Sequence, residues 1–162
     1  MRTNFSIIFT FLVIALLSFG CRVKTRSNEN LQSFAFRLKP GEDLQEGIAS
    51  YCNQNNIKAG WVSTCVGSLT NYNIRFANQP STSSGTGHFE IVSLTGTISD
   101  NGMHMHLSIS DSLGKTIGGH LMPGCKIYTT AEIVLLSTDK YKFTRENDGT
   151  TPWDEFQVKR KH

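Results

Sequence analysis

The sequence predicts an α+β domain dominated by a largely antiparallel β-sheet. Three observations support this class. One amphipathic helical pattern over residues 43–52 precedes a long series of short runs in which apolar and polar residues alternate. Turn signals separate most of these runs, and Asp100-Asn101-Gly102 between two of them is typical of a β-hairpin. A length of 162 residues with 38% hydrophobic residues fits a single folded domain.

The predicted elements follow one another in a simple order. A strand over residues 34–38 ends at Pro40 and Gly41, which form a turn signal. A short helix follows, because Asp43 is a suitable N-cap with Glu46 three residues later, and its one apolar face needs a sheet to cover. Seven further strands are predicted at 59–67, 71–76, 89–99, 103–111, 117–121, 127–136 and 141–145, with a flexible loop at 79–87.

The N-terminal residues predict export. Residues 5–17 are apolar except for Ser6 and Thr10, and small residues flank Phe19, so residues 1–20 have the pattern of a signal peptide. Cys21 comes next and resembles the lipidated cysteine of a bacterial lipobox, although Leu17 is one position early and Phe19 is bulky. The interpretation is a protein of the cell envelope, lipid-anchored to the membrane. Ordinary cleavage, which yields a secreted or periplasmic soluble protein, and an uncleaved anchor are the alternatives.

The rest of the chain divides into a polar tether at 21–32, one folded domain at 33–158 and a basic tail at 159–162. Charge separates the domain from the ends. Residues 31–158 carry nine Lys or Arg against twelve Asp or Glu, a net charge of −3, whereas the whole chain has +3. The folded part therefore lacks the basic surface of a nucleic-acid-binding domain, and we do not expect it to bind DNA.

Three cysteines remain after Cys21, namely Cys52, Cys65 and Cys125. An odd number cannot all pair within the chain, and their surroundings are apolar or helical, so we predict buried free thiols. A disulfide between Cys52 and Cys65 is the alternative in an oxidising compartment.

A pair of histidines on one strand is the main chemical feature. Met103, Met105, Leu107 and Ile109 alternate with His104, His106, Ser108 and Ser110, so both histidines lie on the polar face. Residues two apart on a strand are about 7 Å apart, and their imidazoles can converge on one ion at about 2 Å. His120, which follows two glycines, is the candidate third ligand, and neutral imidazoles favour zinc.

The same residues have a simpler interpretation. A His-x-His pair on a strand can be a solvated polar face without a ligand. Glu132, within an apolar strand, is either an additional ligand or a charge with a local hydrogen-bonding partner. Spacing alone does not choose between these interpretations.

Several motifs together resemble those of the PPC family, the plant and prokaryote conserved domain. They are Gly102-x-His104-x-His106-x-Ser108, Gly118-Gly119-His120-Leu121, Gly124 and Thr130-Ala131-Glu132-Ile133, in this order. Upstream, Gly87-His88-Phe89-Glu90-Ile91-Val92 is similar to the family's Gly-Arg-Phe-Glu-Ile-Leu motif, with His88 in place of arginine. Histidine lacks the bidentate fork of arginine, so a plant-type partner contact is not expected there.

The resemblance covers residues 34–156 and carries several expectations. It implies a mixed sheet with packed short helices, a homotrimer, and a metal site formed by His104, His106 and His120 near a subunit boundary. Prokaryotic relatives are often named as DNA-binding proteins, but the arginine-glycine hook of plant members has no counterpart here.

Three functions remain in competition. The preferred hypothesis is a non-catalytic module of the cell envelope that binds zinc, another divalent metal or a small-molecule ligand. DNA binding, as in the family's usual naming, is the first alternative. A small zinc-dependent hydrolase-like enzyme, in which Glu132 or Glu90 moves a proton, is the second. We prefer a protein that is not an enzyme, because no nucleophile motif, phosphate loop or cofactor fingerprint occurs in the sequence.

Overall fold

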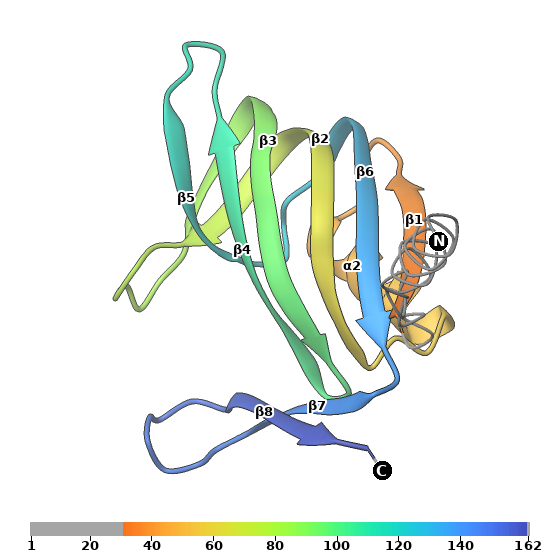
Figure 1. The fold of residues 1–162 in the computed structure, drawn as a ribbon. Helices are drawn as coiled ribbons and strands as arrows, with labels where there is room; N and C mark the ends of the chain where they lie inside the picture. Colours follow the sequence, from red (N-terminus) through yellow and green to blue (C-terminus); the bar gives the residue numbers. More distant parts are fainter. Residues whose placement is uncertain (1–30, 162) are drawn as a thin grey trace, which may run out of the picture.

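The computed structural model describes residues 31–161. The predicted signal peptide, Cys21 and most of the predicted tether lie outside these residues. A six-stranded sheet has the order β1-β6-β2-β3-β4-β5, and a separate hairpin is formed by β7 and β8 (Figure 1). The elements are β1 (Leu31–Leu38), α2 (Leu44–Gln54), β2 (Ala59–Arg75), β3 (Ser83–Ser99), β4 (Gly102–Ser110), β5 (Thr116–Leu121), β6 (Ile127–Thr138), β7 (Tyr141–Glu146) and β8 (Glu155–Arg160).

Every strand pairing within residues 31–161 is antiparallel, and α2 is the one helix described there. The prediction of an α+β domain with a largely antiparallel sheet is thus confirmed, whereas the mixed sheet and the several helices are not seen. The physical reason lies in the position of β6. The crossover through α2 joins β1 to β2, which run parallel to each other, but β6 lies between them and is antiparallel to both.

The sheet curls so that four strands close on themselves. The end of β2 pairs with β5 as well as with β3, through Ile74 opposite Leu121 and Arg75 opposite His120 (Figure 1). This curvature needs a long, bent strand, and β2 has irregular register between Gly67 and Leu69. The two strands predicted at 59–67 and 71–76 are therefore one, because the break in alternation marks a bulge and not a turn.

Three other strands differ from the prediction. β1 begins at Leu31, so residues 31 and 32 belong to the sheet and not to the predicted tether at 21–32. β3 begins at Ser83, within the segment predicted as a loop, and its first residues alternate between half-buried and exposed side chains. β8 was not predicted at all, because it is short and rich in charged residues, none of its residues is fully buried, and it pairs only with β7. Of these strands, β3 and β8 have composition that resembles a loop, and their hydrogen-bonding partners stabilise them.

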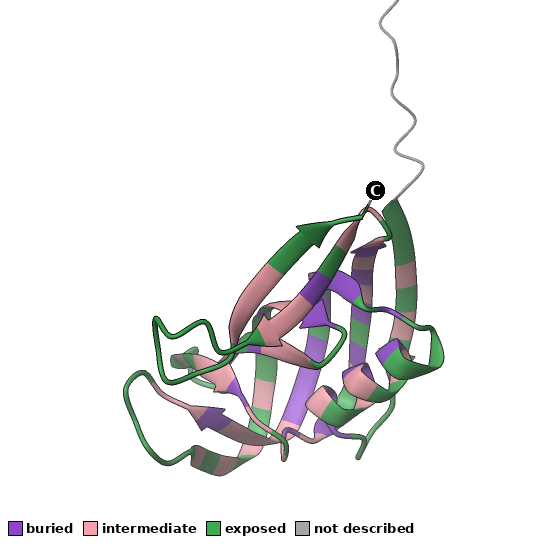
Figure 2. Cartoon of the chain, turned by 90° about the horizontal axis from the view of Figure 1, so that it is seen from below, coloured by how far each residue is buried: buried purple, intermediate pink, exposed green. Residues whose placement is uncertain are grey.

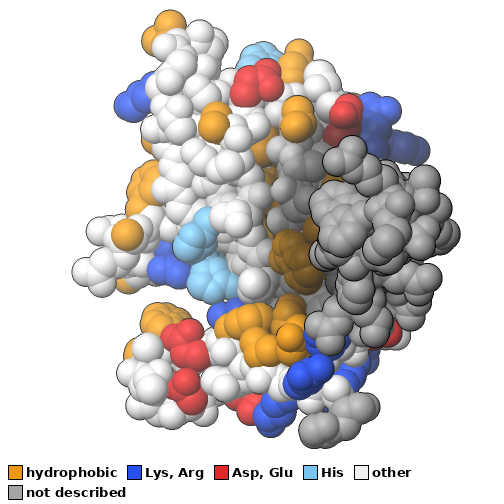
Figure 3. Space-filling view, viewed as in Figure 1, with side chains coloured by type: hydrophobic (Ala, Val, Ile, Leu, Met, Phe, Trp, Pro, Cys, Tyr) orange, Lys and Arg blue, Asp and Glu red, His pale blue; other side chains and the backbone are white. Residues whose placement is uncertain are grey.

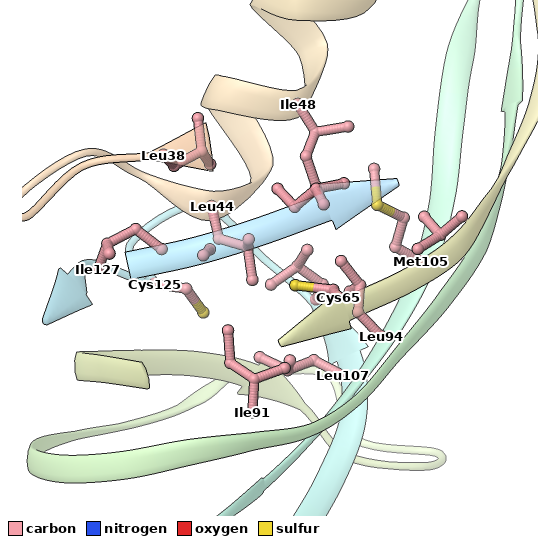
Figure 4. Close-up of a cluster of buried hydrophobic side chains, with 14 of the residues drawn as sticks. Leu38, Leu44, Ile48, Cys65, Ile91, Leu94, Met105, Leu107, Cys125 and Ile127 are labelled. Carbon is pink, nitrogen blue, oxygen red and sulfur yellow. The ribbon is translucent and has the colours of Figure 1, made fainter. Parts of the chain in front are cut away.

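The core lies between α2 and the concave face of the sheet. Leu44, Ile48 and Cys52 of the helix are buried and belong to this core. Figure 2 shows buried positions where the helix faces the sheet, and Figure 4 shows Leu44 and Ile48 among the core side chains. Phe36 of β1 stacks on Tyr51 of the helix, with ring centroids 3.7 Å apart. The predicted amphipathic helix and its N-cap at Asp43 are confirmed.

The three cysteines of the domain are buried and free, as predicted, and Cys52 and Cys65 do not form a disulfide. Burial raises the pKa of Cys52 to about 11 and that of Cys65 to about 12. Burial also raises the pKa of Cys125 to about 11. Thiols of this kind stay protonated at neutral pH and act as core side chains. Within residues 31–161, no helix has the length and hydropathy to cross a bilayer.

The C-terminal hairpin lies across the turn between β3 and β4 (Figure 1). The backbone N–H of Asp100 donates to the carbonyl of Phe143 at 3.0 Å. The side chain of Asn101 pairs with the backbone of Arg145 twice: its amide donates to the carbonyl at 2.7 Å, and its oxygen accepts from the N–H at 2.8 Å. These contacts fix the position of Arg145 beside β4.

Candidate metal centre

Strand β4 orients the first two histidines. Met105, Leu107 and Ile109 are buried on its inner face, so the alternation of the strand directs His104 and His106 to the other face. The predicted division of this strand into a core face and a polar face is confirmed.

Strand β5 brings the third histidine to the same place. His120 lies directly opposite His106 in the antiparallel pairing of β4 with β5. The two preceding glycines allow this approach: a Cβ on Gly118 would lie 2.9 Å from the carbonyl oxygen of Leu107, and one on Gly119 would lie 2.6 Å from that of Arg75. β5 thus fits closely between β4 and β2, which any larger residue at these positions would prevent.

The three imidazoles lie at distances compatible with a shared ion. One potential ligand atom from each of His104, His106 and His120 can be chosen so that all lie within 4.8 Å of one another. The Nε2 atoms of His104 and His106 are 3.1 Å apart. Two nitrogens bound to one zinc ion at about 2.1 Å are at most about 4.2 Å apart, so a small ring movement brings the set to bonding distance. The His106 side chain is exposed, so no buried neighbour opposes such a movement.

Burial and positive charge lower the pKa of two of the three histidines, His104 and His120. Burial lowers the pKa of His120 to about 4, assisted by His104, Arg75 and His106. Burial also lowers the pKa of His104, assisted by Arg145. The Nδ1 atom of His120 is buried and has no hydrogen-bond partner among the described residues. Neutral imidazoles and an unsatisfied ring nitrogen are properties that a bound divalent metal would use, since each bond to the metal needs a free lone pair.

Arg145 restricts the tautomer of His104. One of its terminal nitrogens lies 3.2 Å from His104 Nδ1. Because arginine only donates hydrogen bonds, Nδ1 is the acceptor and the ring proton lies on Nε2, where it can be donated to His106. A metal bound to Nε2 of neutral His104 would move that proton to Nδ1, and the guanidinium of Arg145 would then need another acceptor.

The two arginines beside the histidines were not predicted. Arg75 pairs with His120 across the strands β2 and β5, and Arg145 comes from the C-terminal hairpin. Figure 3 shows the histidines at a notch between the sheet and the hairpin, with basic side chains next to them. No sequence signal links these arginines to the histidines, because Arg145 is 41 residues from His104 and depends on the docking of the hairpin.

Glu132 and the upstream motif lie elsewhere on the sheet. Glu132 is exposed on β6, opposite Arg37 and Val66, and the ligand group formed by the described residues contains no carboxylate. The motif of residues 87–92 occupies the middle of β3. Of its members Gly87, His88, Phe89, Glu90, Ile91 and Val92, Phe89 and Ile91 pack toward the core, while His88, Glu90 and Val92 are exposed. The motif therefore contributes core side chains to β3, and it is not part of the histidine cluster.

Comparison with known proteins identifies the type of domain. Residues 25–139 match the model of the Plants and Prokaryotes Conserved (PCC) domain. Two curated relatives, named bifunctional protein GlmU, come from Synechococcus strains. The chain is 39% identical to one over 131 residues and 40% identical to the other over 129 residues. These alignments cover 81% and 80% of the chain but only 21% and 20% of the relatives, so the chain spans about a fifth of their length.

Solved structures share the fold. A hypothetical protein from Salmonella cholerae-suis is 37% identical with a TM-score of 0.79, covering 82% of this chain and 96% of its own. The metal-containing protein AF0104 from Archaeoglobus fulgidus is 22% identical with a TM-score of 0.68, covering 78% and 93%. A candidate DNA-binding protein from Bacteroides thetaiotaomicron is 17% identical with a TM-score of 0.69, covering 77% and 91%.

Proposed function

The chain belongs to the Plants and Prokaryotes Conserved domain family, and from this premise we propose that it is a non-catalytic module binding one zinc ion through His104, His106 and His120. The observation that carries the proposal is the convergence of the three imidazoles from β4 and β5. Three neutral nitrogen ligands suit zinc and leave one coordination position for a further ligand. The metal-containing relative from Archaeoglobus supports the proposal.

The arrangement favours binding over catalysis. A zinc hydrolase needs a group near the metal that accepts a proton from the attacking water. Glu132 and Glu90 are the carboxylates that the enzyme hypothesis requires, and both are exposed on other parts of the sheet. The side chain in contact with His104 and the residue paired with His120 are instead arginines, which only donate hydrogen bonds.

Metal analysis against pH tests the proposal. We expect one zinc ion per chain at pH 7. His120 and His104 are already neutral at this pH, so zinc does not have to compete with an added proton for their nitrogen lone pairs. As pH falls, protons compete for the nitrogen lone pairs. Because the pKa of His104 is lowered and that of His120 is lowered to about 4, we expect zinc to stay bound below the ordinary imidazole pKa of about 6.5 and to be released as the pH approaches and passes 4. Elemental analysis after dialysis at a series of pH values measures this. A zinc content well below one ion per chain at pH 7, or one that does not fall even well below the His120 pKa of about 4, contradicts the proposal.

Membrane anchoring and assembly complete the proposal. We place the domain in the cell envelope, held by lipid on Cys21 after removal of residues 1–20, because of the small-x-small-Cys junction. The intact mass of the exported protein tests the anchor, and a retained Met1 would contradict it.

The homotrimer implied by the family is supported by exposed apolar side chains on the outer face of the sheet, such as Val66 at 61% and Val92 at 55% exposed. Light scattering of the domain tests the trimer, and the mass of a single chain would contradict it.

DNA binding is the alternative that a relative's name suggests. The charge of the folded part argues against it, because residues 31–158 carry nine basic against twelve acidic side chains. Phosphate contacts supply most of the affinity of non-specific DNA binding. Salt-sensitive binding of a DNA duplex with a Kd below about 1 μM would overturn our proposal in favour of DNA binding.

A further inference from the structure

We infer that the histidine site also binds a small divalent oxyanion, of which inorganic phosphate is the simplest, between the metal and the guanidinium groups of Arg75 and Arg145. This inference rests on the proposed function, since it assigns the ligand of the open metal position. Three features carry it: the position of the two arginines, their lack of acidic partners, and the charge of the site.

Hydrogen bonds of its backbone, and not of its side chain, anchor Arg145 to the turn between β3 and β4. The two hydrogen bonds with the Asn101 side chain involve only the backbone N–H and carbonyl of Arg145. Its guanidinium is consequently free to exchange partners, and in the structure one nitrogen contacts His104 Nδ1 at 3.2 Å. If a metal takes Nε2 of His104, the proton on Nδ1 faces the arginine, and the guanidinium donors need a new acceptor.

Arg75 adds a second guanidinium from the opposite strand. Arg75 lies directly across from His120 in the antiparallel pairing of β2 with β5, so the two side chains project from the same face of the sheet. The side chain is half-buried. Histidines from β4 and β5 are thus accompanied by arginines from β2 and β7.

Neither arginine has a carboxylate partner. The ion pairs within residues 31–161 join Lys58 to Asp100 and Lys126 to Asp43, and neither involves Arg75 or Arg145. Glu155 of β8 lies opposite Glu146, the residue after Arg145, and its carboxylate accepts a hydrogen bond from the hydroxyl of Thr151. Two half-buried guanidinium groups without acidic neighbours in contact are a usual composition for an anion-binding site.

The charge count favours a divalent anion. Three neutral imidazoles leave the charge of a divalent ion uncompensated, and the two arginines and Glu155 bring the local formal charge to about +3. Phosphate supplies oxygens to a metal and to an arginine fork at once, whereas acetate carries only one negative charge. We therefore expect phosphate to bind more tightly than acetate and to strengthen zinc binding in return, because coupling between two ligands is reciprocal.

Calorimetric titration of the zinc-loaded domain with inorganic phosphate tests the inference. We expect a Kd below about 1 mM for the wild type and an increase of about tenfold or more in Arg75→Gln and in Arg145→Gln, since each loses a charge-assisted hydrogen bond. Zinc content should stay at the wild-type level in both variants, because neither residue supplies a ligand. Arg37→Gln, which changes an arginine on β1 that contacts Thr129 and Thr130, is the matched control and should bind phosphate as the wild type does.

The two proposals fail separately in this experiment. Zinc bound at one ion per chain with no phosphate binding, or with equal phosphate affinity in the wild type and both variants, overturns the inference and leaves the zinc site standing. Equal affinity for phosphate and acetate overturns the choice of a divalent anion. Absence of zinc from the wild type overturns both proposals. Circular dichroism of each variant shows that its fold is intact, and Arg145→Lys, which keeps the charge without the fork, should give intermediate affinity.

Discussion

Replacing His106 with alanine is expected to lower the zinc affinity of the domain by at least about a hundredfold, more than the loss of most supporting residues around a metal site. His106 is the central ligand of the proposed site: its Nε2 lies 3.1 Å from that of His104, and its backbone lies opposite His120. The variant keeps only two imidazoles, and two protein ligands rarely hold zinc against a chelator. Isothermal titration with zinc and elemental analysis both measure the effect.

The fold should not change in this variant. His106 is exposed, and its replacement removes no core contact, so we expect the free energy of unfolding to stay within about 0.5 kcal/mol of the wild type. His88→Ala is the matched control, because His88 is also an exposed histidine on a strand of the sheet but contacts Tyr128 and not the cluster. If both variants bind zinc as the wild type does, the three histidines are a solvated polar face.

Replacing Asp43 with alanine is expected to lower the free energy of unfolding by about 3 kcal/mol, as both a helix cap and a buried charge-assisted contact are lost. Asp43 is only 5% exposed. Its Oδ1 accepts from the N–H groups of Gln45 and Glu46 at 3.0 and 3.2 Å, and its Oδ2 accepts from that of Gly124 at 2.7 Å. Lys126 Nζ lies 3.5 Å from the same Oδ2. One carboxylate therefore joins the start of α2 to the loop before β6.

Chemical denaturation of three variants separates these contributions. Asp43→Asn keeps one side-chain oxygen that can cap the helix, but its NH2 group cannot accept the hydrogen bond from Gly124. Its free energy of unfolding should therefore lie between those of the wild type and Asp43→Ala. Asp111→Ala is the control: the Asp111 carboxylate also accepts from two backbone N–H groups, but both belong to its own turn. We expect it to cost less than about 1 kcal/mol. A similar cost for Asp43→Ala and Asp111→Ala would show that the contact with Gly124 contributes nothing.

Local sequence patterns predicted those parts of the domain that depend on neighbours along the chain. The alternation of residues 103–110 placed His104 and His106 on one face, because side chains on a strand have a period of two. Asp43 and Glu46 marked the start of α2, because a capping side chain needs only the next three residues. Asp100-Asn101-Gly102 predicted the turn between β3 and β4 for the same reason.

Residue composition misled the prediction where partners far along the chain decide the structure. The segment at 83–87 looks like a loop, but β2 supplies its hydrogen bonds. The strands at 59–67 and 71–76 are continuous because β3 and β6 pair along both sides of the bulge. The order β1-β6-β2 has no local signal, since β6 follows β1 by about 90 residues and yet separates it from β2.

The sequence by itself determined the α+β class, the helix cap, the polar face that carries two histidines, and the family to which the domain belongs. The tertiary structure alone decided that β5 closes against both β4 and β2, which brings His120 to the other two, and that Arg75 and Arg145 lie beside them while Glu132 does not. The physical reason is range. Alternation and capping arise within a few residues of backbone, whereas the surroundings of the histidines depend on strand order and on the docking of the C-terminal hairpin, which only the packing of the whole domain establishes.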